Sequence, residues 1–171
     1  MENHKSGLGL FVLFLIAGCS SNSSPTCTDQ TVMDLVLEIS NEALFKQLLP
    51  AQLQANYPII IEEAKDTAVS IEYEKIDPQG TGFVWGTMPV ESFLTFVNIS
   101  PTAASIKDNI DLEIRKIDVV LDAIRIHGED NDIKKVSCES NLVFANGNTL
   151  PIQYSAQLTE DQQIWVEVFG L

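Results

Sequence analysis

The sequence predicts an α+β fold in which an N-terminal helix packs on a C-terminal antiparallel β-meander, with a mixed region between them. Apolar residues recur at helical spacing over residues 28–49, which indicates an amphipathic helix. From about Asp111 apolar and polar residues alternate, which is typical of half-buried strands. Hairpin-sized connections separate these later segments, and connections that short join antiparallel neighbours.

The first predicted helix begins at Thr28 or Asp29, because both residue types cap helix N-termini. Its apolar stripe comprises Val32, Leu35, Val36, Ile39 and Ala43. Acidic residues occupy another face at i, i+4 and i+8, namely Asp34, Glu38 and Glu42. Pro50 is expected to end this helix, because proline removes a backbone donor and clashes with the preceding turn.

The middle of the chain, 51–110, predicts a second helix, then a strand from about Val69 to Ile76, and a glycine-rich loop around 77–86. "PVESFLTFV" predicts a short helix, and "SPTAAS" predicts a break before the next element. Two residues of the loop, Phe83 and Trp85, have two interpretations. They form either an aromatic loop tip that contacts a partner or a sugar, or a strand whose rings fill the core.

The predicted sheet begins with a strand over at least 117–127, bent near Asp118 or Ala123, and "HGEDND" at 127–132 is expected to be a turn. A second strand covers 133–144, with one face formed by Val136, Cys138, Ser140, Leu142 and Phe144. "NGN" at 146–148 is a strong hairpin signal, because Asn-Gly tolerates positive φ.

Two further strands complete the predicted meander. The third strand has one face formed by Ile152, Tyr154, Ala156 and Leu158. "EDQQ" turns the chain into the last strand, whose two faces hold Ile164, Val166 and Val168 on one side and Trp165 and Phe169 on the other. Three hairpin-sized connections in a row predict an antiparallel meander with the helix packed on one face of the sheet.

The N-terminus carries an uncharged apolar run from Gly7 to Gly18. A membrane-spanning helix needs roughly 20 apolar residues, so this run suits the core of a secretory signal instead. Residues 16–19, "IAGC", resemble a bacterial lipobox, which implies that the Cys19 thiol is acylated with diacylglycerol and that cleavage then removes residues 1–18. The alternative is an ordinary signal peptide with an incidental cysteine.

The lipobox resemblance divides the chain into a signal peptide at 1–18, an acylated cysteine with a flexible linker at 19–26, and a single α+β domain at 27–171. Stable anchoring needs more than one acyl chain, and a fully modified lipoprotein cysteine resembles that case. Ser20 resembles the signal that sorts such proteins to the outer membrane rather than the inner one. The sequence therefore predicts a membrane partner reached through the N-terminal lipid.

The chain has three cysteines, and two remain if Cys19 carries lipid. An exported protein meets an oxidising compartment, where a remaining pair usually forms a disulfide. We therefore expect Cys27 and Cys138 to be joined, with two separate buried thiols as the alternative. The bond would tie the start of the first helix to a late strand.

"CTDQTVMDLVLEI" near the start, together with "KVSCESNLVF" and "YSAQLTEDQQIWVEVFGL" near the end, resembles a group of small, uncharacterised bacterial lipoproteins. In that group a helix opened by a cysteine packs on a sheet whose last strand carries a V-E-V-x-G-L-like segment. The resemblance implies an anchored envelope domain and supplies no catalytic residues. A helix on an antiparallel sheet also resembles cystatin-like and nuclear-transport-factor-like folds in general architecture.

The composition and the motifs argue against several functions. A formal net charge of −14 repels nucleic acid and anionic lipid headgroups. Cleavage of the signal peptide would remove His4 and leave His127 as the single histidine of the mature chain. Neither a zinc site nor catalysis by histidine is therefore expected. The acidic turns around Asp130 and Asp161 do not match a calcium loop, and neither a metal nor another cofactor is expected.

The sequence thus predicts a lipid-anchored cell-envelope protein that binds another envelope protein and is not an enzyme. Assembly, immunity or exclusion, and inhibition of an envelope enzyme are the roles considered. A small-ligand carrier with a pocket between helix and sheet is one alternative. A hydrolase using paired carboxylates, with Glu62 and Glu63 as possible members, is the other.

Overall fold

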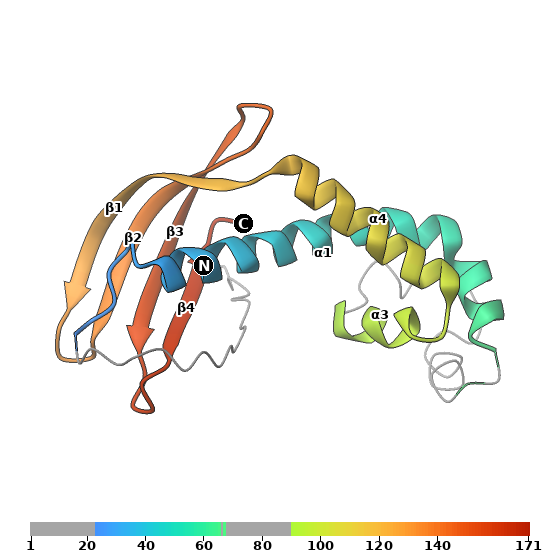
Figure 1. Ribbon diagram of the computed structural model, residues 1–171, viewed down its shortest axis with the longest axis horizontal. Coiled ribbons are helices and arrows are strands. Elements are labelled where there is room, and N and C mark those ends of the chain that lie inside the picture. The colour runs from blue at the N-terminus through green and yellow to red at the C-terminus, as the bar shows by residue number, and fades with distance from the viewer. Residues whose placement is uncertain (1–22, 66, 68–89) are drawn as a thin grey trace, which may run out of the picture. The chain divides into compact units, whose positions relative to one another are not determined.

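The computed structural model describes residues 23–65, 67 and 90–171 and confirms the α+β class (Figure 1). The helices are α1 (Gln30–Glu63), α3 (Val90–Val97) and α4 (Pro101–Ile117). The strands are β1 (Val120–Asp130), β2 (Lys135–Val143), β3 (Thr149–Leu158) and β4 (Ile164–Phe169). The strand expected from Val69 to Ile76 lies outside the described residues.

The chain divides into two compact units, and the boundaries fall within α1 and at the end of α4. In its described part, the sheet unit comprises 23–42 and 117–171, and the helical unit comprises 43–65, 67 and 90–116. In chain order the helical unit is therefore inserted into the sheet unit. The sequence predicted one domain over 27–171 with a mixed middle.

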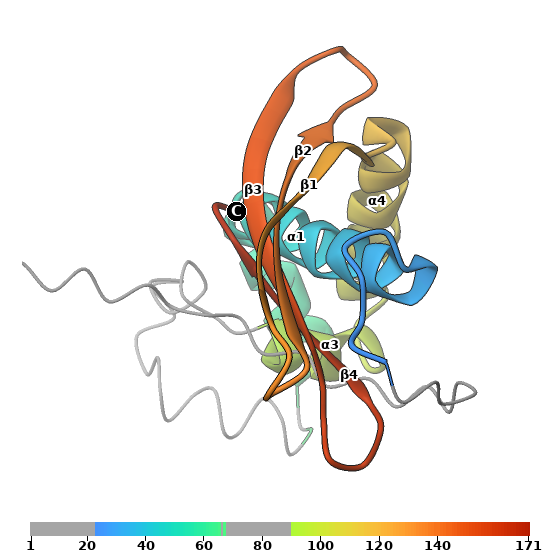
Figure 2. The ribbon, with the colours of Figure 1, turned by 90° about the vertical axis from the view of Figure 1, so that its left-hand side faces the viewer.

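The sheet unit is an antiparallel meander with strand order β1-β2-β3-β4, and the start of α1 crosses one face of it (Figures 1 and 2). From α1 the core receives Val32, Leu35, Val36 and Ile39, the stripe that the helical spacing predicted. From the strands it receives Val136, Cys138, Leu142, Ile152, Tyr154, Ala156, Val166 and Val168. The alternation along β2, β3 and β4 thus gives one covered face and one outer face, as predicted.

The helical unit has a separate apolar core. Its fully buried side chains come from the second part of α1 and from α3 and α4: Leu53, Ile60, Phe93, Phe96 and Ala103. Phe45, Leu49, Ile106 and Ile110 are also buried in this core. The short helix predicted from "PVESFLTFV" is α3, whose buried residues are Phe93 and Phe96.

The prediction that the first helix ends at Pro50 is wrong. The helix α1 continues to Glu63 and contains both Pro50 and Pro58. Each proline costs the helix one backbone hydrogen bond. That cost is offset because Leu49 and Leu53, on either side of Pro50, are buried in the core of the helical unit.

The prediction of alternating strand structure from Asp111 is also wrong up to Ile117, because α4 continues to that residue. Ile106 and Ile110 recur four residues apart and are buried, whereas Leu112 is 46% exposed. The helical spacing, and not the alternation, determines which residues contact the core.

The expected break "SPTAAS" is in fact the start of α4. The backbone carbonyl of Ser100 accepts a hydrogen bond from Ala104 N–H at 3.0 Å, and the Ser100 hydroxyl accepts one from Ala103 N–H at 3.0 Å. Ser100 is therefore the N-cap, and Pro101 occupies the first helical position, where a missing donor costs nothing.

The strand predicted from residue 117 begins instead at Val120, because α4 extends to Ile117. The bend predicted within this strand is confirmed at Ala123, which has φ of 54°, whereas Asp118, with φ of 46°, lies in the link between α4 and β1. A register shift between Asp122 and Arg125 places two β1 residues opposite Ser140, which defines a β-bulge. The Ser140 hydroxyl donates to the Asp122 carbonyl at 2.8 Å and holds the bulge.

The turn predicted at 127–132 begins too early, because β1 extends to Asp130. The Asp130 carboxylate accepts the backbone N–H groups of Asp132 and Ile133, so the turn forms immediately after that residue. The predicted "NGN" hairpin is confirmed, with Gly147 at φ 83° between β2 and β3.

Candidate functional site

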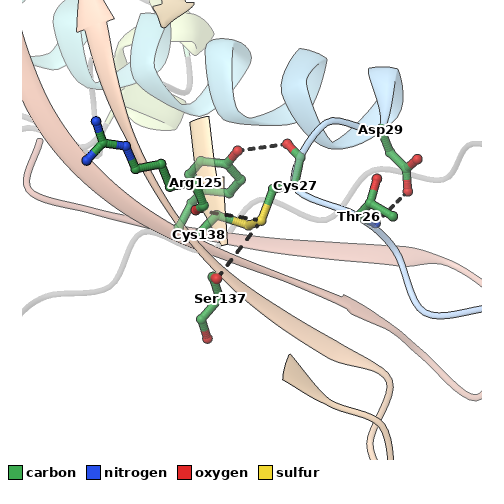
Figure 3. Close-up of a disulfide and its surroundings, with 7 residues drawn as sticks. Thr26, Cys27, Asp29, Arg125, Ser137 and Cys138 are labelled. Atoms are coloured by element: carbon green, nitrogen blue, oxygen red, sulfur yellow. Dashed lines mark hydrogen bonds between the residues drawn. A yellow bond between two sulfur atoms is a disulfide. The ribbon is translucent and has the colours of Figure 1, made fainter. Parts of the chain in front are cut away.

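The predicted disulfide between Cys27 and Cys138 is present in the structure (Figure 3). The Cα atoms are 5.9 Å apart, and the cysteines are 111 residues apart in sequence. Both side chains are buried, and they join the segment before α1 to β2. The Cys27 sulfur also lies 4.0 Å from the carbonyl oxygens of Arg125 and Ser137, which are contacts only, because a disulfide sulfur has no proton to donate.

Tyr154 fixes the same segment from β3. Its buried hydroxyl donates a 2.8 Å hydrogen bond to the Cys27 carbonyl. Burial raises the pKa of the Tyr154 hydroxyl above its usual value, so the hydroxyl keeps its proton and remains a donor. The disulfide and this hydrogen bond together attach the start of α1 to the sheet at two strands.

The outer face of the sheet, which points away from α1, has a pocket of about 450 Å³. Its side chains come from all four strands and include Arg125, Glu139, Asn141, Pro151, Gln153 and Phe169. The register explains the grouping, because Arg125 pairs with Glu139, Glu139 with Gln153, and Gln153 with Phe169. Side chains that are far apart in sequence thus form one row across the sheet.

Gly170 closes one side of this pocket and has φ of 96°, which favours glycine. A Cβ atom at this position would lie 3.2 Å from the Pro151 carbonyl oxygen. The absence of a side chain therefore lets the chain after β4 lie close to β3 along the pocket wall.

Three polar side chains of the pocket make no hydrogen bond to any other residue that the structure describes: Arg125, Asn141 and Gln153. Glu139 has a partner, because its Oε1 atom lies 3.1 Å from Nδ1 of His127. Both groups of that pair are largely exposed to solvent, so the pair contributes little to stability. The pocket therefore contains hydrogen-bond donors and acceptors that no other described side chain or backbone group uses.

A second surface of the sheet unit is strongly acidic. The turns after β1 and β3 lie at the same end of an antiparallel meander. The last residues of β1 and these two turns expose Glu129, Asp130, Asp132, Glu160 and Asp161 there. We call these five residues the acidic end. The pocket lies nearer the β2–β3 turn, at the opposite end of the strands, so the two surfaces are distinct.

Three residues selected from the sequence, Cys19, Phe83 and Trp85, lie outside the described residues. Both the lipidation of Cys19 and the two interpretations of the aromatic pair therefore stay predictions. His127 lies in β1 beside the pocket, in contact with Glu139. Sequence reasoning did not find the pocket residues, since only the strand register brings Arg125 beside Gln153 and Phe169.

The two glutamates proposed as possible hydrolase acids have different surroundings. Glu62 is exposed and pairs with Lys65 at 3.4 Å. Glu63 accepts hydrogen bonds from the Ser100 hydroxyl at 2.5 Å, the Thr102 N–H at 3.0 Å and the Thr102 hydroxyl at 2.8 Å. The Glu63 carboxylate is thus used at the N-terminus of α4, which favours a negative charge there.

Removing the Ser100 side chain is expected to lower the free energy of unfolding of the helical unit by about 1 kcal/mol, because α4 loses its N-cap. Urea unfolding of Ser100→Ala measures this loss. Ser105→Ala is the matched control, since Ser105 is exposed within the same helix and should change stability little. An equal loss in both variants would contradict the cap.

The contribution of Glu63 depends on pH. The Ser100 hydroxyl and the Thr102 N–H stabilise the carboxylate and lower the pKa of Glu63 below its ordinary 4.5. A carboxyl group whose pKa is lower in the folded state than in the unfolded state stabilises the fold at pH values above its unfolded-state pKa. This stabilisation is lost as the pH falls through the folded-state pKa. The stability difference between wild type and Glu63→Gln should therefore shrink on acidification below about pH 4.5.

Among the residues that the structure covers, no group of three or more His, Cys, Asp or Glu could hold a metal ion. Likewise, no helix in the described ranges is long and apolar enough to cross a bilayer. Comparison with known proteins returns no matching family model, no matching curated protein and no matching solved structure.

Proposed function

We propose that this chain is a bacterial cell-envelope lipoprotein that binds another envelope protein without catalysing a reaction. The buried disulfide between Cys27 and Cys138 is the observation that supports a location in the cell envelope. Structural disulfides form and persist in oxidising compartments outside the cytoplasm. The lipobox-like segment ending at Cys19 supplies the expected anchor, and Ser20 favours the outer membrane.

The acidic end supports a protein partner of opposite charge. Its five exposed carboxylates lie near two lysines, Lys134 and Lys135. Lys135 pairs with Glu167 at 3.5 Å. The surface therefore remains negative and would attract a basic partner electrostatically. Such a contact suits an assembly accessory, an immunity or exclusion protein, or an inhibitor, since each role needs only a rigid binding surface.

The geometry supports the two alternatives less well. A carrier needs space between helix and sheet, but side chains of α1 such as Val32 and Val36 fill that space and are fully buried. A hydrolase with paired carboxylates needs two acids facing one cavity. The side chains that line the pocket include a single carboxylate, Glu139.

Metabolic labelling with palmitate in a bacterial host tests the anchor. The wild-type chain should incorporate label and fractionate with the outer membrane, and Cys19→Ala should lose both properties, because the acylated thiol is gone. Cys138→Ala is the matched control and should stay labelled. Label retained in Cys19→Ala would refute the lipid anchor.

The same cells test the partner. A photo-crosslinking residue at Asp132, in the acidic end, should capture an envelope protein. Capture should decline with rising ionic strength, because salt screens the attraction between exposed charges, largely so beyond about 10 Å at 0.1 M. The control position is Asn146, in the turn at the opposite end of the strands. Equal capture at both positions, or capture independent of salt, would count against docking at the acidic end.

A further inference from the structure

The pocket on the outer face of the sheet holds an unusual set of unused polar groups. Asn141 and Gln153 each carry a carboxamide that donates and accepts hydrogen bonds, and Arg125 adds a planar fork of donors. These side chains come from β1, β2 and β3 and converge through the strand register. A ligand rich in groups that both donate and accept would satisfy them together.

The charge of the pocket selects against ionic ligands. The pocket is lined by one cation, Arg125, and one carboxylate, Glu139. An anion bound at Arg125 would be repelled by Glu139, and a cation bound at Glu139 would be repelled by Arg125. The pocket is locally balanced although the whole chain carries −14, so an uncharged polar ligand fits it best.

The rim of the pocket adds apolar surface beside these polar groups. Phe169 is 50% exposed on β4, and Pro151 lies on β3 close to Gly170. A sugar ring has polar edges and apolar faces, so its edges can bond the carboxamides while a face packs on the Phe169 ring. The volume of about 450 Å³ lies within the range of roughly 300–1,000 Å³ found for small-ligand sites.

We propose that this pocket binds a neutral glycan, an uncharged hydroxyl-rich oligosaccharide segment. The hydroxyl groups along the edges of its sugar rings would form hydrogen bonds with Asn141, Gln153 and Arg125, and one ring face would pack on Phe169. This activity goes beyond the proposed function and uses a different surface, since the protein partner is assigned to the acidic end. The same domain would thus contact a glycan and a protein at opposite ends of its strands.

Calorimetric titration of the acylated full-length protein tests the glycan site. The protein is held in zwitterionic micelles, because glycoside detergents would present the same chemistry as the ligand. Neutral oligomers of N-acetylglucosamine and of glucose are the probes, and an oligouronate and an uncharged Ser-Asn-Gly peptide are the competitors. We expect saturable binding of a neutral oligosaccharide and weaker binding of the oligouronate and the peptide.

Variants of the pocket make the assignment specific. Gln153→Ala should weaken binding about fivefold to tenfold, the equivalent of one lost hydrogen bond. Phe169→Ala should weaken oligosaccharide binding by a similar factor. If Phe169→Ala does not fold, Asn141→Ala takes its place as the second pocket variant. Gln157→Ala is the matched control, because Gln157 is an outward carboxamide on the same strand but does not line the pocket.

Several results would overturn the proposal. These are no binding of any neutral oligosaccharide, tighter binding of the oligouronate or of the peptide, and equal effects of Gln153→Ala and Gln157→Ala. Circular dichroism of each variant confirms that the fold is intact. Failure of the glycan site would leave the acylation and cross-linking results unchanged, so the two proposals fail independently.

Discussion

Loss of the Cys27–Cys138 disulfide should lower the free energy of unfolding by about 2–5 kcal/mol, which is the usual range for a native disulfide. The bond closes a loop spanning 111 residues, and the chain-entropy model gives about 4–5 kcal/mol for a loop of that length. The disulfide also holds in place the segment in which the Cys27 carbonyl accepts a hydrogen bond from the Tyr154 hydroxyl. Without the bond, the start of α1 would depend on that hydrogen bond and on its apolar stripe alone.

Urea unfolding with and without dithiothreitol measures the effect of the disulfide. The reductant should lower the wild-type midpoint to that of the double variant Cys27→Ala/Cys138→Ala, and it should not change the midpoint of the double variant. Thiol titration confirms that the bond was reduced. A wild-type midpoint that stays constant after verified reduction would show that the disulfide contributes no stability.

Phe93→Ala should lower the stability of the helical unit by about 3–5 kcal/mol, because it removes a fully buried ring and leaves a cavity. The Phe93 ring lies 6.2 Å from that of Phe45, at an interplanar angle of 44°. Such a tilted pair contributes about 0.5–1.5 kcal/mol beyond the buried area. The truncation therefore removes a contact between α3 and α1 as well as apolar volume.

Amide hydrogen exchange locates the loss caused by Phe93→Ala. Protection should fall in the amides of α3 and α4, which belong to the helical unit. The adjacent Leu94→Ala is the control, because Leu94 is 38% exposed and its truncation should change stability by less than about 0.5 kcal/mol. Similar exchange in the two variants would mean that Phe93 does not organise this core.

Where local spacing and burial agree, the sequence predicted the structure correctly. In β2 the buried residues alternate with half-exposed ones, so the period of two identifies Cys138 as a core residue. The cysteine count and the expected oxidising compartment then identified Cys27 as its partner. These features follow from periodicity and covalent chemistry, neither of which requires knowledge of distant contacts.

Where two local signals conflict, the sequence predictions failed. Pro50 predicts a helix end, yet the apolar residues around it continue at helical spacing, and their burial outweighs the lost hydrogen bond. Leu112 and Ile114 alternate with charged residues as in a strand, yet the burial of Ile106 and Ile110, four residues apart, in the helical core selects the helix. Local propensity is a weak prior when tertiary burial offers more free energy.

The sequence by itself determined the α+β class, the strands from β2 onward and the cysteine pair. The reason is that hydrophobic periodicity is a local property of each segment, and the number of cysteines is read directly from the chain. Only the tertiary structure decided that the chain forms two compact units and that Arg125, Gln153 and Phe169 share one pocket. The reason is the strand register: a shift of a single residue would turn each of these side chains to the other face of the sheet. That register depends on bulges, turns and core contacts acting together, which no single stretch of sequence specifies.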